Sequence, residues 1–342
     1  MLQSMLGAIS ADLAIDIGSA STRISAAGRG VIVDVPTRVA ILEERDGKRR
    51  LLAVGAEARQ MEGRTPADVR VLAPVQEGNI VDFEVVEVLL RHLMLQVQGR
   101  RLWVGPRVAI AVEHGLSDVE RRAVRESAEA SGAREVLLVE QPLAAAIGAG
   151  LSVDEACGSL VLDVGAGHTC VSILSLGGIV FSRRLRVGGD HLDEALVHHL
   201  REHHGLLISM TAAEEVRQRI GSVMPGGPNP SEWVRGRHID SGYPRALELD
   251  ANELRMALQG PVQQIAEAVL QSLERSPPDL AADVADTGVV LVGGVAALSG
   301  LDRAISRMAG LPVIVPDEPH LVVVRGTADW MGRNQRKKAA AG

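Results

Sequence analysis

Apolar residues along the chain recur with two different periods. Spacings of three and four predict helices over residues 81–97, 117–131 and 190–204, and the second of these begins with the capping-box pair Ser117 and Glu120. A further helix of small residues is expected over 142–150. Short runs rich in Val, Ile and Leu lie between these stretches and predict strands. This alternation of strands and helices is typical of an α/β fold.

One strand-turn-strand pattern occurs twice. Residues 13–25 read LAIDIGSASTRIS and residues 160–172 read LVLDVGAGHTCVS, with five of thirteen positions identical at an offset of 147. Each copy predicts a hairpin whose turn contains Asp-x-Gly and small residues. Two unrelated hairpins with ordinary turns remain the alternative. The place of the copies, near the starts of the two halves, favours a duplicated domain.

The two turns have the chemistry of a phosphate site. Small residues allow backbone N–H groups to approach phosphate oxygens, and Ser or Thr hydroxyls add donors. Asp16 and Asp163, at the strand ends, offer carboxylates to Mg2+ or to its water ligands. A third turn, with Gly293 and Gly294, follows an apolar run at 289–292. The three turns together predict a nucleotide site.

Composition and charge restrict the classes of function. A length of 342 residues indicates two domains. The formal charge of −7, with only three Trp, one Tyr and two Phe, argues against a nucleic-acid binder that needs basic surface and stacking platforms. Cys157 and Cys170 have no disulfide or zinc spacing, which favours a reducing, cytoplasmic location. No apolar run is long enough to span a bilayer, and the N-terminus lacks the basic region of a secretory signal.

These motifs resemble the actin-like ATPase superfamily, which includes actin, heat-shock chaperones and sugar kinases. Within this superfamily, four stretches are similar to bacterial MreB proteins: DLAIDIGSAST, VGAEARQMEGRTP, EQPLAAAIGAG and VGGDHLDEAL. The chain as a whole resembles a divergent MreB-like or Mbl-like paralogue. The resemblance implies the actin-like fold, with two duplicated α/β domains, a smaller inserted subdomain in each, and a nucleotide cleft between them. It also implies that the protein binds ATP with Mg2+ and assembles with itself into filaments. The expected location is the inner face of the cell membrane, and the expected partners are cell-wall elongation or morphogenesis proteins.

The resemblance, with the charge cluster EERDGKRR and the loop PGGPNP as signs of insertions, divides the chain into subdomains. The expected parts are a membrane-binding amphipathic segment at 1–11, subdomain IA at 12–32 and 74–146, IB at 33–73, IIA at 147–182 and 247–332, IIB at 183–246, and a basic tail, expected to be disordered, at 333–342.

The resemblance also assigns nucleotide contacts residue by residue. The first phosphate turn is Asp16, Gly18, Ser19, Ala20 and Ser21, and the second is Asp163, Gly165, Ala166, Gly167, His168 and Thr169. Glu214 and Arg217 would reach the ribose and adenine, with a surface ion pair as the alternative. The residues expected beneath the adenosine are Gly293, Gly294 and Val295.

Several positions depart from the family pattern. Gln141, preceded by Glu140, stands where MreB proteins usually carry the Glu that orients the attacking water. An amide orients water but does not accept a proton. Further substitutions in the second and third turns are Ala166, His168, Cys170 and Val295. The catalytic candidates are therefore Gln141, Glu140 and Asp163. Together, the substitutions predict weakened contact with the nucleotide and slow hydrolysis. His168 either donates to the γ-phosphate or points away from it.

Two segments are candidates for membrane contact. Leu2, Met5, Leu6 and Ile9 would share one face of a helix. Leu102 and Trp103, flanked by arginines, suit the headgroup boundary, with the start of a strand as the alternative. His199 and His203 have a spacing that could chelate a metal, but no nearby acid completes a known motif, so no metal is expected there.

The sequence therefore favours a membrane-associated cytoskeletal ATPase. The alternative is a non-polymerising actin-fold scaffold that binds nucleotide and recruits partners.

Overall fold

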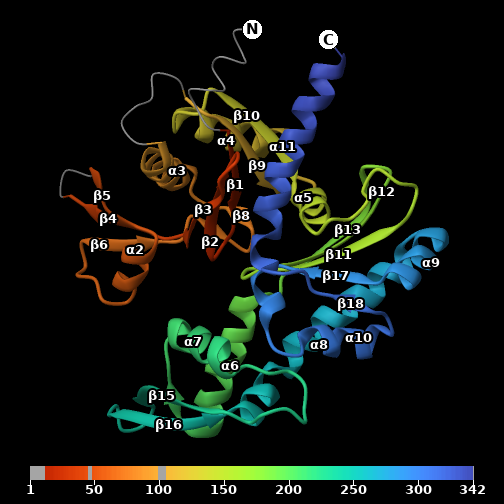
Figure 1. The fold of residues 1–342 in the computed structure, drawn as a ribbon. Helices are drawn as coiled ribbons and strands as arrows, with labels where there is room; N and C mark the ends of the chain where they lie inside the picture. The colour runs from red at the N-terminus through yellow and green to blue at the C-terminus, as the bar shows by residue number, and fades with distance from the viewer. Residues whose placement is uncertain (1–11, 45–47, 99–104, 342) are drawn as a thin grey trace. The chain divides into compact units, whose positions relative to one another are not determined.

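The computed structural model describes residues 12–44, 48–98 and 105–341 (Figure 1). The chain divides into two compact units. The first comprises Met1–Ser152 and Leu321–Gly342, and the second comprises Val153–His320. Each unit is built on its own five-stranded sheet, so the α/β class and the number of domains predicted from the sequence are confirmed.

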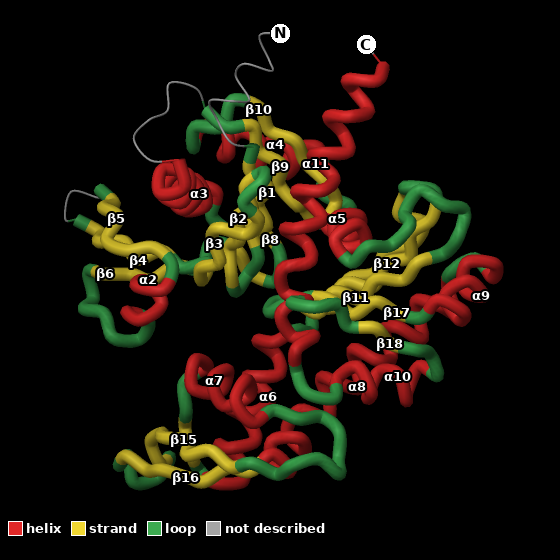
Figure 2. Tube along the Cα trace, in the orientation of Figure 1, coloured by secondary structure: helices red, strands yellow, loops and turns green. Residues whose placement is uncertain are grey.

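The sheet of the first unit has the strand order β10-β9-β1-β2-β3 (Figure 2). Its strands are β1 (Leu13–Ile17), β2 (Ser21–Ala26), β3 (Gly30–Pro36), β9 (Arg107–Val112) and β10 (Glu135–Glu140). Strands β1, β9 and β10 are parallel, whereas β1, β2 and β3 are antiparallel. The carboxyl ends of the three parallel strands therefore meet at one edge of the sheet.

Helices cover both faces of this sheet. They are α3 (Phe83–Gln98), α4 (Asp118–Ala130), α5 (Gln141–Gly148) and α11 (Val322–Ala341). Leu13 and Ile15 of β1 share an apolar core with α3 and α4, while α11 packs on the other side, against β1 and α5. The capping box predicted for α4 is confirmed: the Ser117 hydroxyl accepts from the Glu120 N–H, and the Glu120 carboxylate accepts from the Ser117 N–H.

Helix α11 differs from the sequence expectation, which placed residues up to 332 in the second domain and treated 333–342 as a tail. In the structure α11 packs on α5 within the first unit. Gly148 and Gly326 lie at the crossing, where a Cβ on either residue would overlap a backbone carbonyl oxygen of the other helix. Two glycines allow this close approach. Local periodicity does not reveal such a long-range contact.

A smaller set of elements is inserted after β3. It contains a sheet of order β5-β4-β6 and a short hairpin, formed by β4 (Val39–Glu43), β5 (Arg49–Val54), α2 (Ala56–Met61), β6 (Val69–Leu72), β7 (Val75–Gln76) and β8 (Asn79–Ile80). The pairing of β4 with β5 agrees with the hairpin expected around the charge cluster. Because β3 runs to Pro36 in the main sheet, the insertion begins a few residues later than the predicted boundary at 33.

The second unit repeats the plan of the first. Its sheet has the order β13-β12-β11-β17-β18, with β11 (Ser159–Val164), β12 (Thr169–Ser175), β13 (Gly178–Leu185), β17 (Val289–Val292) and β18 (Val313–Ile314). Asp16 pairs with Arg23 in the first hairpin, and Asp163 pairs with Cys170 in the second. Both partners are displaced by the same offset of 147, so the two hairpins have the same register.

Five helices and a small sheet complete the second unit. They are α6 (Gly189–His204), β14 (Leu206–Leu207), α7 (Met210–Ile220), β15 (Ser231–His238), β16 (Pro244–Asp250), α8 (Ala251–Arg275), α9 (Pro278–Thr287) and α10 (Leu301–Ala309). The small sheet has the order β14-β15-β16 and falls largely within the insertion predicted at 183–246. Leucines of α6 and α8 share one apolar core with β11 and β17.

Candidate functional site

The first turn, residues 16–21, connects β1 to β2 in the first unit. The N–H of Gly18 donates to the carbonyl oxygen of Ser21 at 3.0 Å and closes the turn. A Cβ on Gly18 would lie 3.1 Å from the same oxygen, so a side chain there would crowd the hydrogen bond. The sequence motif thus folds into a tight turn that depends on its glycine.

The carbonyl groups of Gly18, Ser19 and Ala20 bond to one neighbouring segment. The Thr37 hydroxyl donates to Gly18 O at 2.7 Å, the Arg38 guanidinium donates to Ser19 O at 3.2 Å, and the Thr37 N–H donates to Ala20 O at 2.8 Å. In a trans peptide the N–H points away from the carbonyl oxygen. The N–H groups of Ser19 and Ala20 therefore point to the side opposite Thr37, an arrangement that suits an anion.

The catalytic candidates of the first unit follow the carboxyl ends of the parallel strands. Ala111 of β9 pairs with Asp16 on one side and with Val139 of β10 on the other, so β1 and β10 are about 10 Å apart. Gln141 begins α5 directly after β10. The edge of the sheet therefore carries both Asp16, which is buried, and Gln141, which is partly exposed.

Glu140 already has partners. Its carboxylate accepts from the Arg121 guanidinium at 2.7 Å and lies 3.3 Å from His114 Nδ1. These contacts hold the carboxylate against α4 and the loop that follows β9. The Glu140 carboxylate is therefore directed toward protein partners.

The second turn, residues 163–168, has the geometry of the first. The N–H of Gly165 donates to His168 O at 3.0 Å, and a Cβ on Gly165 would lie 3.2 Å from that oxygen. Backbone N–H groups at the start of α6 donate to the carbonyl oxygens of the turn. Gly189 N–H donates to Gly165 O at 3.0 Å, and Asp190 N–H donates to Ala166 O at 2.9 Å. Helix α6 therefore fixes this turn directly.

Arg217 of α7 lies beside the second turn and forms a buried ion pair with Asp193 of α6. The guanidinium donates two hydrogen bonds to the carboxylate, at 2.6 and 3.0 Å, and the two side chains are 8% and 4% exposed. Burial raises the pKa of Asp193 to about 6 despite its charged partner. Burial also works to lower the pKa of Arg217, but Asp193 raises it overall, so Arg217 stays charged.

This pairing differs from the surface alternative considered for Glu214 and Arg217. Glu214 instead accepts from the Gln218 side chain at 3.0 Å, on the same helix. The terminal nitrogen of Arg217 lies 3.3 Å from the position that a Cβ on Gly189 would occupy, and Ala166 Cα lies 3.4 Å from it. The structure thus brings Arg217 next to the second turn and leaves Glu214 on a more exposed part of α7.

The third turn packs against the second. Gly293 has a φ of +94°, and a Cβ there would overlap the Asp163 carboxylate and the Val164 carbonyl oxygen. Gly294 begins a short 3₁₀ helix, and a Cβ there would have no atom within 4 Å. Val295, expected to face the nucleotide, has its side chain buried in the core beside Gly189. Its branched side chain therefore fills the core of the second unit.

The remaining predicted residues are either buried or lie outside the described part of the chain. His168 and Thr169 are buried, and the Thr169 hydroxyl donates to Val187 O at 2.6 Å. Leu102, Trp103 and residues 1–11 lie outside the described residues. Across residues 12–44, 48–98 and 105–341, no helix is both long and apolar enough to cross a membrane.

Sequence reasoning missed the residues that support the two turns. They are Thr37, Arg38, Gly188, Gly189 and Asp193. The last three belong to the stretch VGGDHLDEAL, whose glycine pair was a usable signal. Thr37 and Arg38 carry no comparable local signal.

Comparison with known proteins agrees with this geometry. A family model described as MreB/Mbl protein matches residues 10–339. The chain belongs to the MreB/Mbl family. It is 45% identical over 328 residues to the cell shape-determining protein MreB of Escherichia coli (strain K12), covering 95% of this chain and 94% of that protein. The resemblance inferred from the sequence motifs is therefore confirmed.

Solved structures show the same relationship in three dimensions. MreB5 of Spiroplasma citri bound to AMPPNP matches with a TM-score of 0.91 at 29% identity, covering 97% of this chain and 99% of that one. MamK in a double helical filament matches with a TM-score of 0.78 at 20% identity, covering 94% and 99%. The fold of this MreB/Mbl protein is thus the actin-like fold predicted from the sequence.

Proposed function

We propose that this MreB/Mbl protein binds ATP with Mg2+ and polymerises into membrane-associated filaments that organise cell-wall synthesis and cell shape. The repeated turn carries the proposal. In each hairpin the glycine N–H, of Gly18 or Gly165, donates at 3.0 Å to the carbonyl oxygen three residues further along the chain, and the two hairpins have the same register. The binding of AMPPNP by MreB5, which matches nearly the whole chain, supports a nucleotide as the ligand.

Residues of both turns would bind the phosphates. In the first turn, the N–H groups of Ser19 and Ala20 and the hydroxyls of Ser19 and Ser21 are the donors. In the second, Gly165, Ala166, Gly167, His168 and Thr169 provide a backbone with small side chains at most positions. We assign Glu214 and Arg217 to contacts with the ribose and adenine. The backbone at Gly294, where a Cβ would have no atom within 4 Å, would lie beneath the adenosine.

The donor set also fits Mg2+. Asp16 and Asp163 are carboxylates at equivalent strand ends, and hard oxygen donors are what Mg2+ takes from proteins, often through water. When bound, Mg2+ neutralises charge on the phosphates. Gln141 would orient water without accepting its proton. Since Glu140 is held by Arg121 and His114, we expect hydrolysis to be slow.

Phosphate release from purified protein with Mg2+ and ATP tests the catalytic assignment. Gln141→Glu places a carboxylate at the start of α5 and should accelerate release, by about tenfold or more. Gln141→Ala should lower it. Glu140→Gln is the control at the neighbouring position and should change the rate much less. A Gln141→Ala rate equal to that of the unchanged protein would remove Gln141 from the mechanism.

Polymerisation rests on family membership and on the filament formed by MamK, a relative by fold. Pelleting with and without ATP, under Mg2+, tests it. We expect nucleotide-dependent sedimentation above a critical protein concentration. If the protein binds nucleotide and stays in the supernatant at every concentration, it is the non-polymerising scaffold that the sequence left as the alternative.

Membrane association is assigned to residues 1–11 and to Leu102 and Trp103. The apolar side chains of both segments would enter the headgroup boundary. Co-sedimentation with anionic liposomes should fall several-fold in a Leu102→Ala, Trp103→Ala double variant and in a variant lacking residues 2–10, measured separately. Undiminished co-sedimentation when both changes are combined would contradict the assignment.

A further inference from the structure

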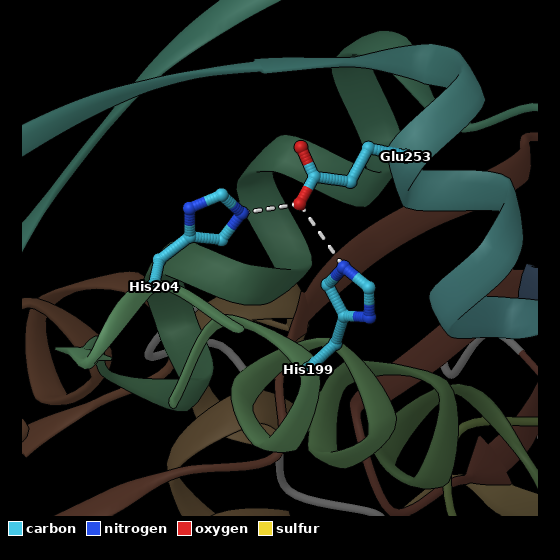
Figure 3. A group of neighbouring side chains, drawn as sticks. All are labelled: His199, His204 and Glu253. Atoms are coloured by element: carbon cyan, nitrogen blue, oxygen red, sulfur yellow. Dashed lines mark hydrogen bonds and ion pairs between the residues drawn. The ribbon is translucent and has the colours of Figure 1, made fainter. Parts of the chain in front are cut away.

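Two imidazoles and one carboxylate converge in the second unit, where the end of α6 meets the start of α8. Figure 3 shows His199 and His204 pointing at the same carboxylate oxygen of Glu253. His199 Nε2 lies 3.0 Å from Glu253 Oε1, and His204 Nε2 forms a hydrogen bond with the same oxygen. Taken one per residue, the three ligand atoms lie within 4.8 Å of one another.

The arrangement differs from the sequence expectation, which paired His199 with His203 and found no acid nearby. His203 is exposed, and its ring is tilted by 50° against that of His199, with the ring centroids 4.4 Å apart. His204 is the last residue of α6, which ends at Gly205 with a φ of +59°. The acid comes from the first turn of α8, far along the chain. Only the fold reveals the set.

Each of the three side chains stands next to a buried anchor. Leu200 follows His199, Leu254 follows Glu253, and Leu206 comes two residues after His204; all three leucines are completely buried. The Arg245 guanidinium donates to His204 O at 3.0 Å, and the Asp250 carboxylate accepts from Glu253 N–H at 2.9 Å. The backbone beneath the cluster is therefore held in place, as a binding site requires.

We propose that His199, His204 and Glu253 bind a divalent transition metal ion, with Zn2+ as the ion that best fits these donors. Zn2+ takes imidazole nitrogen and carboxylate oxygen at about 2.0–2.2 Å, which separates tetrahedral ligands by about 3.4 Å. The 3.0 Å between His199 Nε2 and Glu253 Oε1 is close to that value, and all three ligand atoms lie within 4.8 Å of one another. Binding would displace the protons that the imidazole Nε2 atoms share with the carboxylate, which move to Nδ1 or to solvent, and would leave a fourth position for water.

The site is chemically distinct from the proposed nucleotide site. Two of its three donors are nitrogens, which favour Zn2+ and its transition-metal neighbours, whereas Mg2+ prefers oxygen ligands. Bound metal would join the end of α6 to the start of α8, on either side of the insertion that contains β14, β15 and β16. Because the unfolded chain does not hold these residues together, the metal would stabilise the folded protein.

Zinc titration of the full chain tests the proposal. The protein is stripped with a chelator and titrated with Zn2+ against a chromophoric competitor, in the presence of excess Mg2+. We expect one Zn2+ per chain and a melting temperature raised by about 5 °C at a hundredfold excess over Kd. His199→Ala and Glu253→Gln should each weaken binding by about tenfold or more, since even indirect contacts to a metal are worth that much.

His198→Ala is the matched control, because His198 lies on the same helix with its side chain 71% exposed, and is not one of the three ligands. It should bind Zn2+ as the unchanged protein does. Circular dichroism without metal establishes that each variant is folded. If a variant is unfolded, the visible spectrum of Co2+ bound to the unchanged protein decides: nitrogen coordination at low coordination number supports the site. A fully hydrated spectrum, or equal Zn2+ affinity in folded variants and control, overturns the proposal.

Discussion

The two turns at the starts of the duplicated hairpins have the same internal geometry and different supports. Gly18 and Gly165 make the same hydrogen bond, and the flanking strands pair in the same register. The first turn is held mainly by the side chains of Thr37 and Arg38, whereas the second is held by the backbone of α6. Duplication therefore preserved the turn itself, while the elements that fix it diverged.

The turns differ in donor chemistry as well. At the offset of 147, Ser19 corresponds to Ala166, and Ser21 corresponds to His168. The first turn therefore offers two hydroxyl donors at positions where the second offers a methyl group and a buried imidazole. The second turn therefore offers mainly backbone groups as donors.

The largest effect is expected from breaking the ion pair beside the second turn. Asp193→Leu leaves the buried Arg217 guanidinium without its partner, and this should cost about 3–5 kcal/mol of unfolding free energy. Urea unfolding measures it. A double variant, Asp193→Leu with Arg217→Met, removes both charges and should recover most of the loss, because apolar residues of similar volume fit a buried site.

An exposed pair in the first unit provides the control. Glu126→Leu removes the partner of Arg122 on α4, where both side chains are more than half exposed. Its effect should be far smaller, because water replaces the lost partner. Equal losses for the two single variants would contradict the view that burial makes the Asp193–Arg217 pair matter more to stability than the exposed pair.

Adding a methyl group where α6 meets the second turn should have the next largest effect. The backbone of Gly188 is extended, but a Cβ there would overlap Ala166 O and lie 2.7 Å from Gly165 O. Gly188→Ala should therefore cost about 3 kcal/mol, the upper end of the usual range for overpacking. Gly227→Ala, in an open loop with nothing within 4 Å, should be nearly neutral in the same unfolding measurement. If Gly188→Ala is also neutral, α6 does not fix the turn.

The first turn should respond instead to a side-chain change. Thr37 is completely buried, and its hydroxyl donates to Gly18 O and shares a 2.9 Å hydrogen bond with Thr22. Thr37→Val leaves both partners unsatisfied and should cost about 1–3 kcal/mol, with weaker AMPPNP binding. Thr37→Ser keeps the hydroxyl and should retain most of the affinity. If the Val and Ser variants lose equal affinity, packing rather than the hydrogen bond supports the turn.

The sequence was sufficient to predict the turns and insufficient to predict their supports. An Asp-x-Gly motif between two apolar runs is local, so periodicity and residue type identify both hairpins and their glycines. Thr37 donates to the first turn from another segment of the chain, and Asp193 accepts from Arg217 on the next helix. These contacts depend on tertiary packing. The same reason explains why Glu253 was not connected with His199, and why α11 was assigned to the second domain.

The smallest expected effect concerns the hydroxyl that distinguishes the turns. Ser19 Oγ accepts from Gly78 N–H at 2.9 Å, so Ser19→Ala removes an acceptor and should cost about 1 kcal/mol. The reciprocal change, Ala166→Ser, removes no hydrogen bond and should leave stability nearly unchanged. Because it restores a hydroxyl to the second turn, it should also strengthen AMPPNP binding if that turn contacts phosphate. Weaker binding by Ala166→Ser would mean that Ala166 is needed for the close packing of α6 against the turn, and that its missing hydroxyl is not a deficiency.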